Sequence, residues 1–218
     1  MIDAAWLAPL GRGLGITVLV FLGAGAIAVC SGLTVGVATA RGPAMLRTLC
    51  RIWIELLRGT STLVQLFWVV FALPLVGIRV DPLIGGMLVL GLNCGAYAAE
   101  AVRGAIRAVP RGQLDAAAVL GLSPRQRLLL VELPQALPVV LPTAGNLAVE
   151  LLKNTSLVSL IGLADLTFQG TALRTSTLAD VPVLGVLLAT YFVLALGVAN
   201  LGRWAERGCA RWHRGMAA

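Results

Sequence analysis

Charge is scarce in this chain. Asp, Glu, Lys and Arg make up 12% of its 218 residues, against about 25% in an average soluble domain. Hydrophobic residues make up 58%, and the mean hydropathy is +0.91. Apolar runs of about 20 residues, the length that crosses the hydrocarbon core of a bilayer, recur along the chain. The shortage of charge therefore excludes an ordinary soluble domain and predicts an integral membrane protein surrounded by lipid.

The residues needed for catalysis and metal binding are also missing. Lys153 is the only lysine, and the residue directly before it is Leu152 where the motif needs glycine. The chain therefore lacks the G-x-x-x-x-G-K-[ST] loop that holds nucleotide phosphates. The only histidine, His213, lies beyond the last apolar run. The cysteines have no metal-ligand spacing, and the basic residues form no run of the nucleic-acid-binding type. We expect no catalytic residue, no metal, no cofactor in this chain and no nucleic-acid partner.

Five apolar segments are long enough to span a membrane. We expect all of them to be helical, because an isolated strand or loop would leave backbone groups unpaired in lipid. They cover about residues 16–40, 59–76, 83–102, 131–152 and 182–201, with an amphipathic lead-in at 51–58. The predicted fold is an all-α membrane protein in which residues 1–218 form a single transmembrane domain.

The arginines predict how the bundle is oriented. Most of the 17 basic residues lie in three places: between the first two spans, around the third-to-fourth connection, and after the last span. Cytoplasmic loops of membrane proteins carry such an excess. We therefore expect the N-terminus outside, and the C-terminus and the polar connection at about 108–130 in the cytoplasm.

That polar connection predicts a short protruding helix. Residues 113–120 are alanine-rich and favour a helix, Asp115 is expected in its first turn where the helix dipole favours a carboxylate, and Gly121 can end it in a left-handed conformation. Pro110 is expected to end the preceding helix and Gly112 to allow a turn. Ala116, Ala117 and Ala118 offer a slim surface, and Ser123-Pro124 begins a second helix. The alternative is an ordinary hairpin of two helices.

Prolines and glycines predict how the spans bend and pack. Pro134, Pro138 and Pro142 recur every four residues at the start of the fourth span, which predicts a kinked helix. The kink either transmits movement to a gate or only fits the bundle. Two GxxxG pairs, Gly32/Gly36 and Gly91/Gly95, predict close helix packing.

Polar side chains inside the spans are costly, so they are candidates for a substrate pathway. The candidates are Gln65, Asn93, Glu100, Asn146, Glu150 and Lys153. Glu55 and Glu100 each have an arginine three positions later, Arg58 and Arg103, with which a local ion pair is the competing interpretation. Glu150 and Lys153 either bind the two charges of a zwitterion or form a local salt bridge.

The ordered motifs resemble those of ABC importer permeases of the polar amino-acid type, the histidine/glutamine/arginine group. The resemblance covers about residues 11–207 and includes the EAA loop, with Asp115 where the family usually has Glu. The motifs that carry it are Glu55-Leu56-Leu57-Arg58-Gly59-Thr60, Leu63-Val64-Gln65-Leu66-Phe67, Gly95-Ala96-Tyr97, Glu100, Arg103-Gly104-Ala105-Ile106, Val109-Pro110-Arg111-Gly112-Gln113, Leu133-Pro134-Gln135-Ala136-Leu137, Asn146 and Leu151-Leu152-Lys153-Asn154-Thr155-Ser156-Leu157.

The resemblance implies a type I importer in the bacterial inner membrane. Two permease subunits, identical or similar, would form the pathway, and separate ATP-binding cassette subunits would bind ATP and Mg. An extracytoplasmic solute-binding protein would deliver substrate. The residues implied to couple to the ATPase are Gln113, Asp115, Ala116, Ala117, Gly121 and Pro134.

Two departures from the family pattern concern the substrate. Ser61 stands where the family usually has Pro, and Pro138 stands where Arg or a similar residue is usual. With Phe67-Trp68 and 166–169, they look more like the branch that imports ectoine and hydroxyectoine, so that branch and an ordinary polar amino acid stay open. The competing classes are a stand-alone secondary transporter or channel for small zwitterions and a membrane assembly protein.

Overall fold

The computed structural model describes residues 6–216, which contain helices and turns but no strand. In chain order the main helices are α1 (Leu7–Arg41), α2 (Ala44–Gly59), α3 (Thr62–Phe67), α4 (Pro82–Ala108), α5 (Arg111–Val119), α6 (Pro124–Arg127), α7 (Leu133–Asn154), α8 (Leu166–Thr177) and α9 (Asp180–Met216). Short π-helical segments at Trp68–Ala72 and Leu128–Glu132, and 3-10 segments at Leu73–Val76 and Thr155–Ile161, complete the helical structure.

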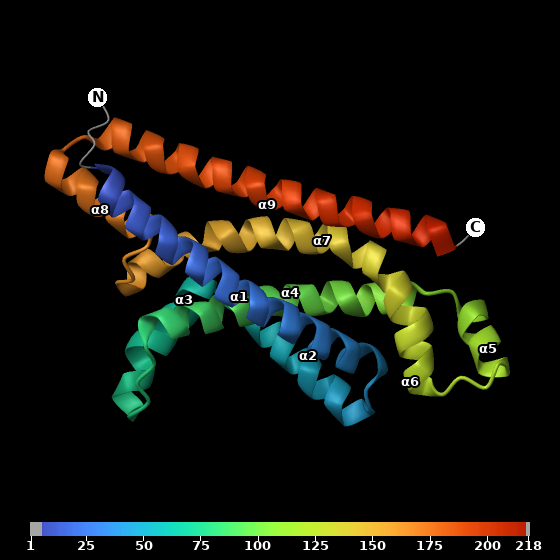
Figure 1. The fold of residues 1–218 in the computed structure, drawn as a ribbon. Coiled ribbons are helices and arrows are strands. Elements are labelled where there is room, and N and C mark those ends of the chain that lie inside the picture. The colour runs from blue at the N-terminus through green and yellow to red at the C-terminus, as the bar shows by residue number, and fades with distance from the viewer. Residues whose placement is uncertain (1–5, 217–218) are drawn as a thin grey trace.

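Four helical stretches are long and apolar enough to cross a membrane: Leu7–Arg41, Pro82–Ala108, Pro124–Ile161 and Asp180–Cys209. A fifth crossing forms if α2 and the stretch Thr62–Val76 count as one span, bent by 100° where they join. The all-α membrane fold with about five spans is thus confirmed. The predicted second span, at about 59–76, corresponds to Thr62–Val76, and the bend separates it from α2, which contains the predicted lead-in at 51–58. The start of α1 lies beside α8 at one end of the molecule, while α5 and the end of α9 lie at the other (Figure 1).

Glycines bring α1 and α4 into direct contact, as the GxxxG pairs predict. A methyl group added to Gly36 would lie 2.7 Å from Cβ of Val102, and one added to Gly91 would lie 2.7 Å from the carbonyl oxygen of Ala24. No real side chain fits at such distances, so the two backbones approach as closely as glycine allows. The buried core lies along this contact and includes Val20, Ala24, Leu66, Val89, Leu90, Leu151, Val158 and Ile161.

At the end of the molecule opposite α5, a buried carboxylate caps α8, and a backbone hydrogen bond joins α8 to α1. Asp165 is fully buried and caps α8 by accepting hydrogen bonds from the backbone N–H groups of Thr167 (3.2 Å) and Phe168 (2.9 Å). The Leu166 N–H donates to the Thr17 hydroxyl of α1 at 3.1 Å. Burial raises the pKa of Asp165, although the two backbone hydrogen bonds act in the opposite direction.

Candidate functional site

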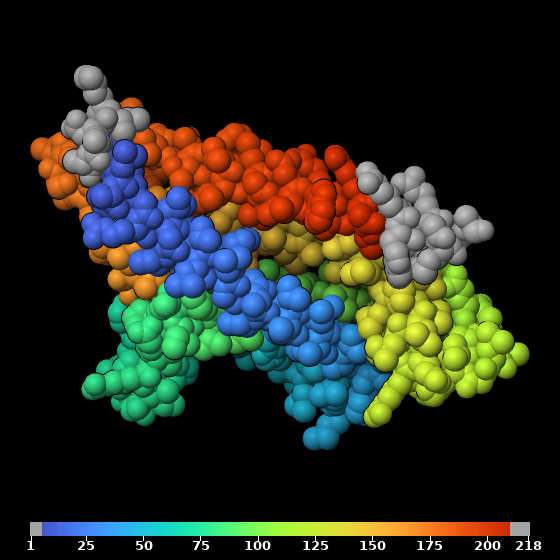
Figure 2. Space-filling model, viewed as in Figure 1, coloured from blue at the N-terminus to red at the C-terminus, as the bar shows by residue number. Residues whose placement is uncertain are grey.

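The helix α5 projects from the end of the molecule (Figure 1), and the space-filling view shows it standing beyond α1 and α4 (Figure 2). Within α5 only Ala117 is buried, with 4% of its surface exposed. A short helix with one buried side chain has little reason to be stable alone. Its position must therefore be held largely by the segments that flank it.

The C-terminal end of α5 is tightly defined. At its C-terminal end Gly121 adopts φ +75°, the Leu122 N–H donates to the Ala117 carbonyl at 3.1 Å, and the Gly121 N–H donates to the Ala118 carbonyl at 3.0 Å. This pair of bonds is the Schellman motif, which needs the left-handed conformation that glycine adopts without strain. The predicted helix end at Gly121 is confirmed.

The next helix starts as expected. Ser123 caps α6, its hydroxyl accepts from the Gln126 N–H, and the Gln126 side chain accepts in return from the Ser123 N–H at 2.9 Å. Pro124 occupies the first turn. This reciprocal capping box satisfies two backbone donors and fixes the direction in which the chain leaves α5.

Three details predicted for α5 are wrong. The helix begins at Arg111, two residues earlier than expected, so Asp115 lies beyond the first turn and loses the favourable position near the helix dipole. Gly112 lies within the helix instead of in a turn. Ala117 faces inward, so the alanines do not form one slim surface.

The outer tip of α5 is apolar, which the sequence patterns did not reveal. Val119 is 88% exposed and Leu120 is 79% exposed. They follow Gln113, Asp115 and Ala116, which are also exposed, and they lie just before the exposed Gly121. Large exposed apolar side chains at the end of a polar projection are typical of a protein contact.

The connection from α6 into α7 is bent. Figure 1 shows the chain turning between α6 and α7. A π-helical segment, Leu128–Glu132, occupies the turn, and Pro134 follows in the first turn of α7. Pro138 and Pro142 lie inside α7, where they remove backbone donors. The predicted bend is therefore present, at the π-helical segment and the first proline.

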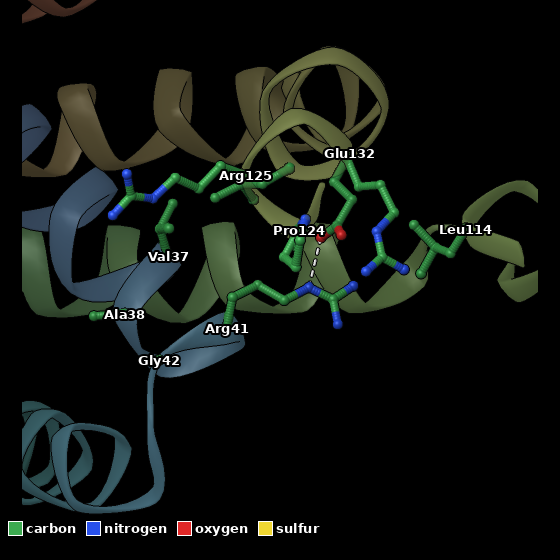
Figure 3. Close-up of a pocket in the computed structure, with 10 residues that line it drawn as sticks. Val37, Ala38, Arg41, Gly42, Leu114, Pro124, Arg125 and Glu132 are labelled. Atoms are coloured by element: carbon green, nitrogen blue, oxygen red, sulfur yellow. Dashed lines mark hydrogen bonds and ion pairs between the residues drawn. The ribbon is translucent and has the colours of Figure 1, made fainter. Parts of the chain in front are cut away.

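An ion pair joins this bend to the end of α1. Arg41 Nε donates to a Glu132 carboxylate oxygen at 2.6 Å, and the Glu132 side chain is 5% exposed (Figure 3). Figure 3 also shows Leu114 of α5 facing this pair across a pocket. The ion pair was not predicted, because the two residues are separated by 91 positions. Through it, the region that carries α5 is attached to the first membrane helix.

The two candidate amides, Gln65 and Asn93, hold the broken span together. Gln65 Nε2 and Asn93 Nδ2 each donate to the backbone carbonyl of Leu57 at 2.9 Å, and Gln65 Nε2 lies 2.6 Å from the Thr60 hydroxyl. The Leu57 carbonyl belongs to the last turn of α2, where helix carbonyls have no partner inside the helix. These amides are thus used within the chain, which favours a structural role at the 100° bend.

The predicted local ion pairs form in one case of three. Arg103 pairs with Glu100 through both nitrogen types of its guanidinium group. Arg58 instead lies over the ring of Tyr97, 4.8 Å from its centre, and makes no ion pair with Glu55. The cation–π contact explains why the expected Glu55–Arg58 pair is absent.

The polar residues of α7 share one exposed face. Asn146, Glu150 and Lys153 are all exposed, although α7 lies in a membrane-spanning stretch. The ion pairs found in the part of the chain that the structure describes do not include one between Glu150 and Lys153. Glu150, Asn93 and Tyr97 line a pocket of only about 10 Å³. That volume holds about one water molecule, so a single chain offers no closed cavity for a solute there.

Family comparison agrees with this architecture. Residues 32–207 match the family described as the inner membrane component of binding-protein-dependent transport systems. This chain belongs to that family. It is a permease subunit of an ABC importer.

Among residues 6–209, no three His, Cys, Asp or Glu side chains gather as a metal site would require.

Relatives match over most of their length. The chain is 43% identical to the probable amino-acid ABC transporter permease protein y4tF of Sinorhizobium fredii, over 95% of this chain and 90% of y4tF. It is 33% identical to the glutamine transport system permease protein GlnP of Escherichia coli, over 81% of each chain. It is 32% identical to the L-cystine transport system permease protein TcyB of Bacillus subtilis, over 77% of this chain and 72% of TcyB.

Solved structures share the fold. A crystal structure of an amino acid ABC transporter with histidines superposes with a TM-score of 0.85 at 31% identity, over 95% of this chain and 99% of that chain. The inward-facing MetNI methionine ABC transporter superposes with a TM-score of 0.82 at 21% identity, over 95% of this chain and 99% of that chain, which supports the fold alone.

Proposed function

We propose that this permease imports polar amino acids, or solutes that resemble them, in a complex driven by a separate ATPase. The observation that carries the proposal is α5: an exposed helix with a defined C-terminal cap, at one end of a membrane-spanning chain that has no phosphate-binding loop of its own. The relatives named for glutamine and cystine transport support the substrate class. ATP and Mg would be bound by the ATP-binding cassette partner.

The proposed mechanism treats α5 as a lever. The apolar tip formed by Val119 and Leu120 would enter a groove of the ATPase, and Gln113, Asp115 and Ala116 would make the polar contacts around it. Displacement of α5 would reach α7 through the capped α6 and the bend that carries Pro134. Because Arg41 holds Glu132, the same displacement would also pull on α1.

The pathway would lie against a second permease subunit, identical or similar. Asn146, Glu150 and Lys153 form a polar, exposed face on a helix that crosses the membrane. Charged and amide groups are costly against lipid, so such a face favours water or a partner subunit. Tyr97 and Glu100 of α4 are partly exposed and would contribute to the same pathway, with Glu150 beside Tyr97 at its edge.

The proposed orientation places α5 and the end of α9 in the cytoplasm of a bacterium, with the protein in the inner membrane. It rests on the arginine excess around α5 and after the last span. The opposite end, with α8 and its buried Asp165, would then face the solute-binding protein.

The substrate itself is proposed only as a class. The glutamine and cystine names of the relatives favour an ordinary polar amino acid, while Ser61 and Pro138 carry the resemblance to the ectoine and hydroxyectoine branch. Calorimetric titration of the cognate solute-binding protein with glutamine, cystine and ectoine distinguishes an ordinary polar amino acid from a compatible solute of the ectoine type. Ectoine binding with no response to amino acids would overturn the amino-acid assignment.

The coupling role is tested by changing Gly121 to Val. Its φ of +75° costs a non-glycine residue roughly 1–2 kcal/mol, and a β-branched residue more. We expect normal membrane insertion, but at least about tenfold loss of ATPase co-purification and of substrate uptake. The matched control is Gly112→Ala, which lies inside the same helix with open space around it and should retain both.

Two outcomes would contradict the proposal. Unchanged uptake by the Gly121→Val variant would remove α5 from the mechanism. Uptake by the purified chain in vesicles without any ATPase would favour a stand-alone secondary transporter or channel.

A further inference from the structure

A pocket rich in arginine lies between α1, α5 and the α6–α7 bend. Its volume is about 410 Å³, and its lining includes Arg41, Arg125, Arg127 and one carboxylate, Glu132 (Figure 3). Glu132 is already paired with Arg41. Two positive charges in the lining are therefore left unbalanced by any lining carboxylate.

One of these arginines carries a buried donor without an acceptor. Arg127 Nε has almost no exposed surface and no hydrogen-bond partner among the described residues. A buried donor left without an acceptor is destabilising, and more so when the group is charged. Because Nε itself is enclosed, an anion in the pocket would interact with the terminal nitrogens of the Arg127 guanidinium group and balance its charge.

The pocket also has an apolar part. Its lining includes Val37, Ala38 and Leu128, and next to Leu128 the large side chains of Leu129 and Leu130 are 61% and 64% exposed. A small soluble anion would gain nothing from contact with these apolar side chains. A molecule with an anionic head and a hydrocarbon tail would satisfy both parts.

The position of the pocket fits the surface of a bilayer. Arg41 is the last residue of α1, a helix long and apolar enough to cross the membrane, and Leu114 reaches the pocket from α5, which projects beyond it. The pocket therefore lies where a membrane helix ends. Basic pockets at this depth are suited to lipid phosphates.

We propose that this pocket binds the phosphate group of an anionic phospholipid. Arg127 would contact the phosphate oxygens through its terminal guanidinium nitrogens, Arg125 would add positive charge beside the pocket, and the acyl chain would lie along Val37 and Leu128. The lipid would thus sit between the end of α1 and the projecting helix α5. This site is separate from the solute pathway on α4 and α7.

The test is lipid retention by the purified full-length chain in detergent, measured by native mass spectrometry with phosphatidylglycerol or phosphatidylcholine. We expect preferential retention of phosphatidylglycerol. Each arginine removed should weaken it about fivefold, so the Arg125→Gln/Arg127→Gln double variant should lose the preference. The matched control is Arg203→Gln/Arg207→Gln, which removes two exposed arginines from α9 and should retain it.

Three results would overturn the proposal. Equal retention of the two lipids by the wild-type chain would remove the lipid site, whatever the variants do. Loss of retention to the same extent in both double variants would assign it to general surface charge. Competition by inorganic phosphate at low millimolar concentration, with no lipid preference, would assign the pocket to a soluble phosphate. Circular dichroism and thermal unfolding establish that each variant is folded before it is compared.

Discussion

Glu132 is a buried carboxylate whose charge is balanced by Arg41, which is itself 41% exposed on its side chain. Taking one partner away from a buried ion pair leaves the other charge unpaired in a medium that solvates it poorly. Because Arg41 reaches solvent, the effect is smaller than for a fully buried pair. Most of the cost of breaking this pair therefore comes from leaving the buried Glu132 carboxylate unpaired.

We therefore predict that Arg41→Gln destabilises the chain by roughly 2 kcal/mol, below the 3–5 kcal/mol of a fully buried pair. Thermal unfolding in detergent, followed by circular dichroism, measures the change. Glu132→Gln is the companion variant: it removes the buried charge and retains an acceptor for Arg41, so it should cost less. A larger loss for Glu132→Gln would show that the ion pair is not the cause.

At this scale the sequence revealed residue types better than their partners. The capping roles of Ser123 and Gly121 follow from local chemistry and were predicted correctly. The partner of Glu132 was not, since nothing in a linear pattern joins two positions 91 residues apart. Gln65 and Asn93 stood out as polar residues in apolar runs, but the sequence did not reveal the carbonyl they share.

The helices α1 and α4 pack closely, because glycines replace side chains along their contact. Adding a methyl group at such a place forces backbone atoms apart, which typically costs 1–3 kcal/mol. The same change at an open position of the same helix has the opposite sign, because alanine favours a helix by up to about 1 kcal/mol over glycine.

Gly91→Ala and Gly104→Ala test this contrast within α4. The Gly91 methyl would meet a backbone oxygen at 2.7 Å, whereas Gly104 has no atom within 4 Å. We expect Gly91→Ala to lower stability by about 1–3 kcal/mol and Gly104→Ala to leave it unchanged or slightly raised, both measured by unfolding in detergent. Equal effects of the two variants would mean that α1 and α4 do not meet at these glycines.

Long helices were easier to predict than the breaks between them. The length of the apolar runs predicts α1, α4, α7 and α9, because a membrane requires about 20 such residues. The start of α5 was placed two residues late, since Gly112 was taken for a turn residue, and glycine is tolerated in the first turn of a helix. The 100° bend after α2 depends on tertiary contacts from Gln65 and Asn93 that local preferences do not encode.

Taken alone, the molecule leaves a polar face of α7 uncovered in a segment that crosses the membrane. Asn146 lies on that face. Val29 of α1 is 61% exposed on an apolar surface. It lies at a similar depth along the bundle, because it lines a pocket with Ala144 and Leu147, which are close to Asn146 in α7. If the polar face borders water in the assembled transporter, the two positions differ in the solvent they meet.

A cysteine placed at each position measures that difference. Each cysteine is introduced into a variant without the four native cysteines, and the assembled complex is treated with a membrane-impermeant maleimide. We predict that Asn146→Cys reacts at least about tenfold faster than Val29→Cys, because the reaction needs a thiolate and water. Denaturation in detergent, followed by labelling, provides the control that both thiols are intact. Equal rates for the two cysteines would contradict a water-filled pathway beside α7.

The shared use of the Leu57 carbonyl by Gln65 and Asn93 has a consequence for anyone who wishes to retune what the transporter carries. Both amides are polar residues within the membrane and so resemble specificity determinants. Changing either would, however, remove a hydrogen bond that holds the end of α2 at the 100° bend. Libraries aimed at new solutes should leave them constant and vary Tyr97, Asn146 and Glu150 instead, whose side chains are at least partly exposed.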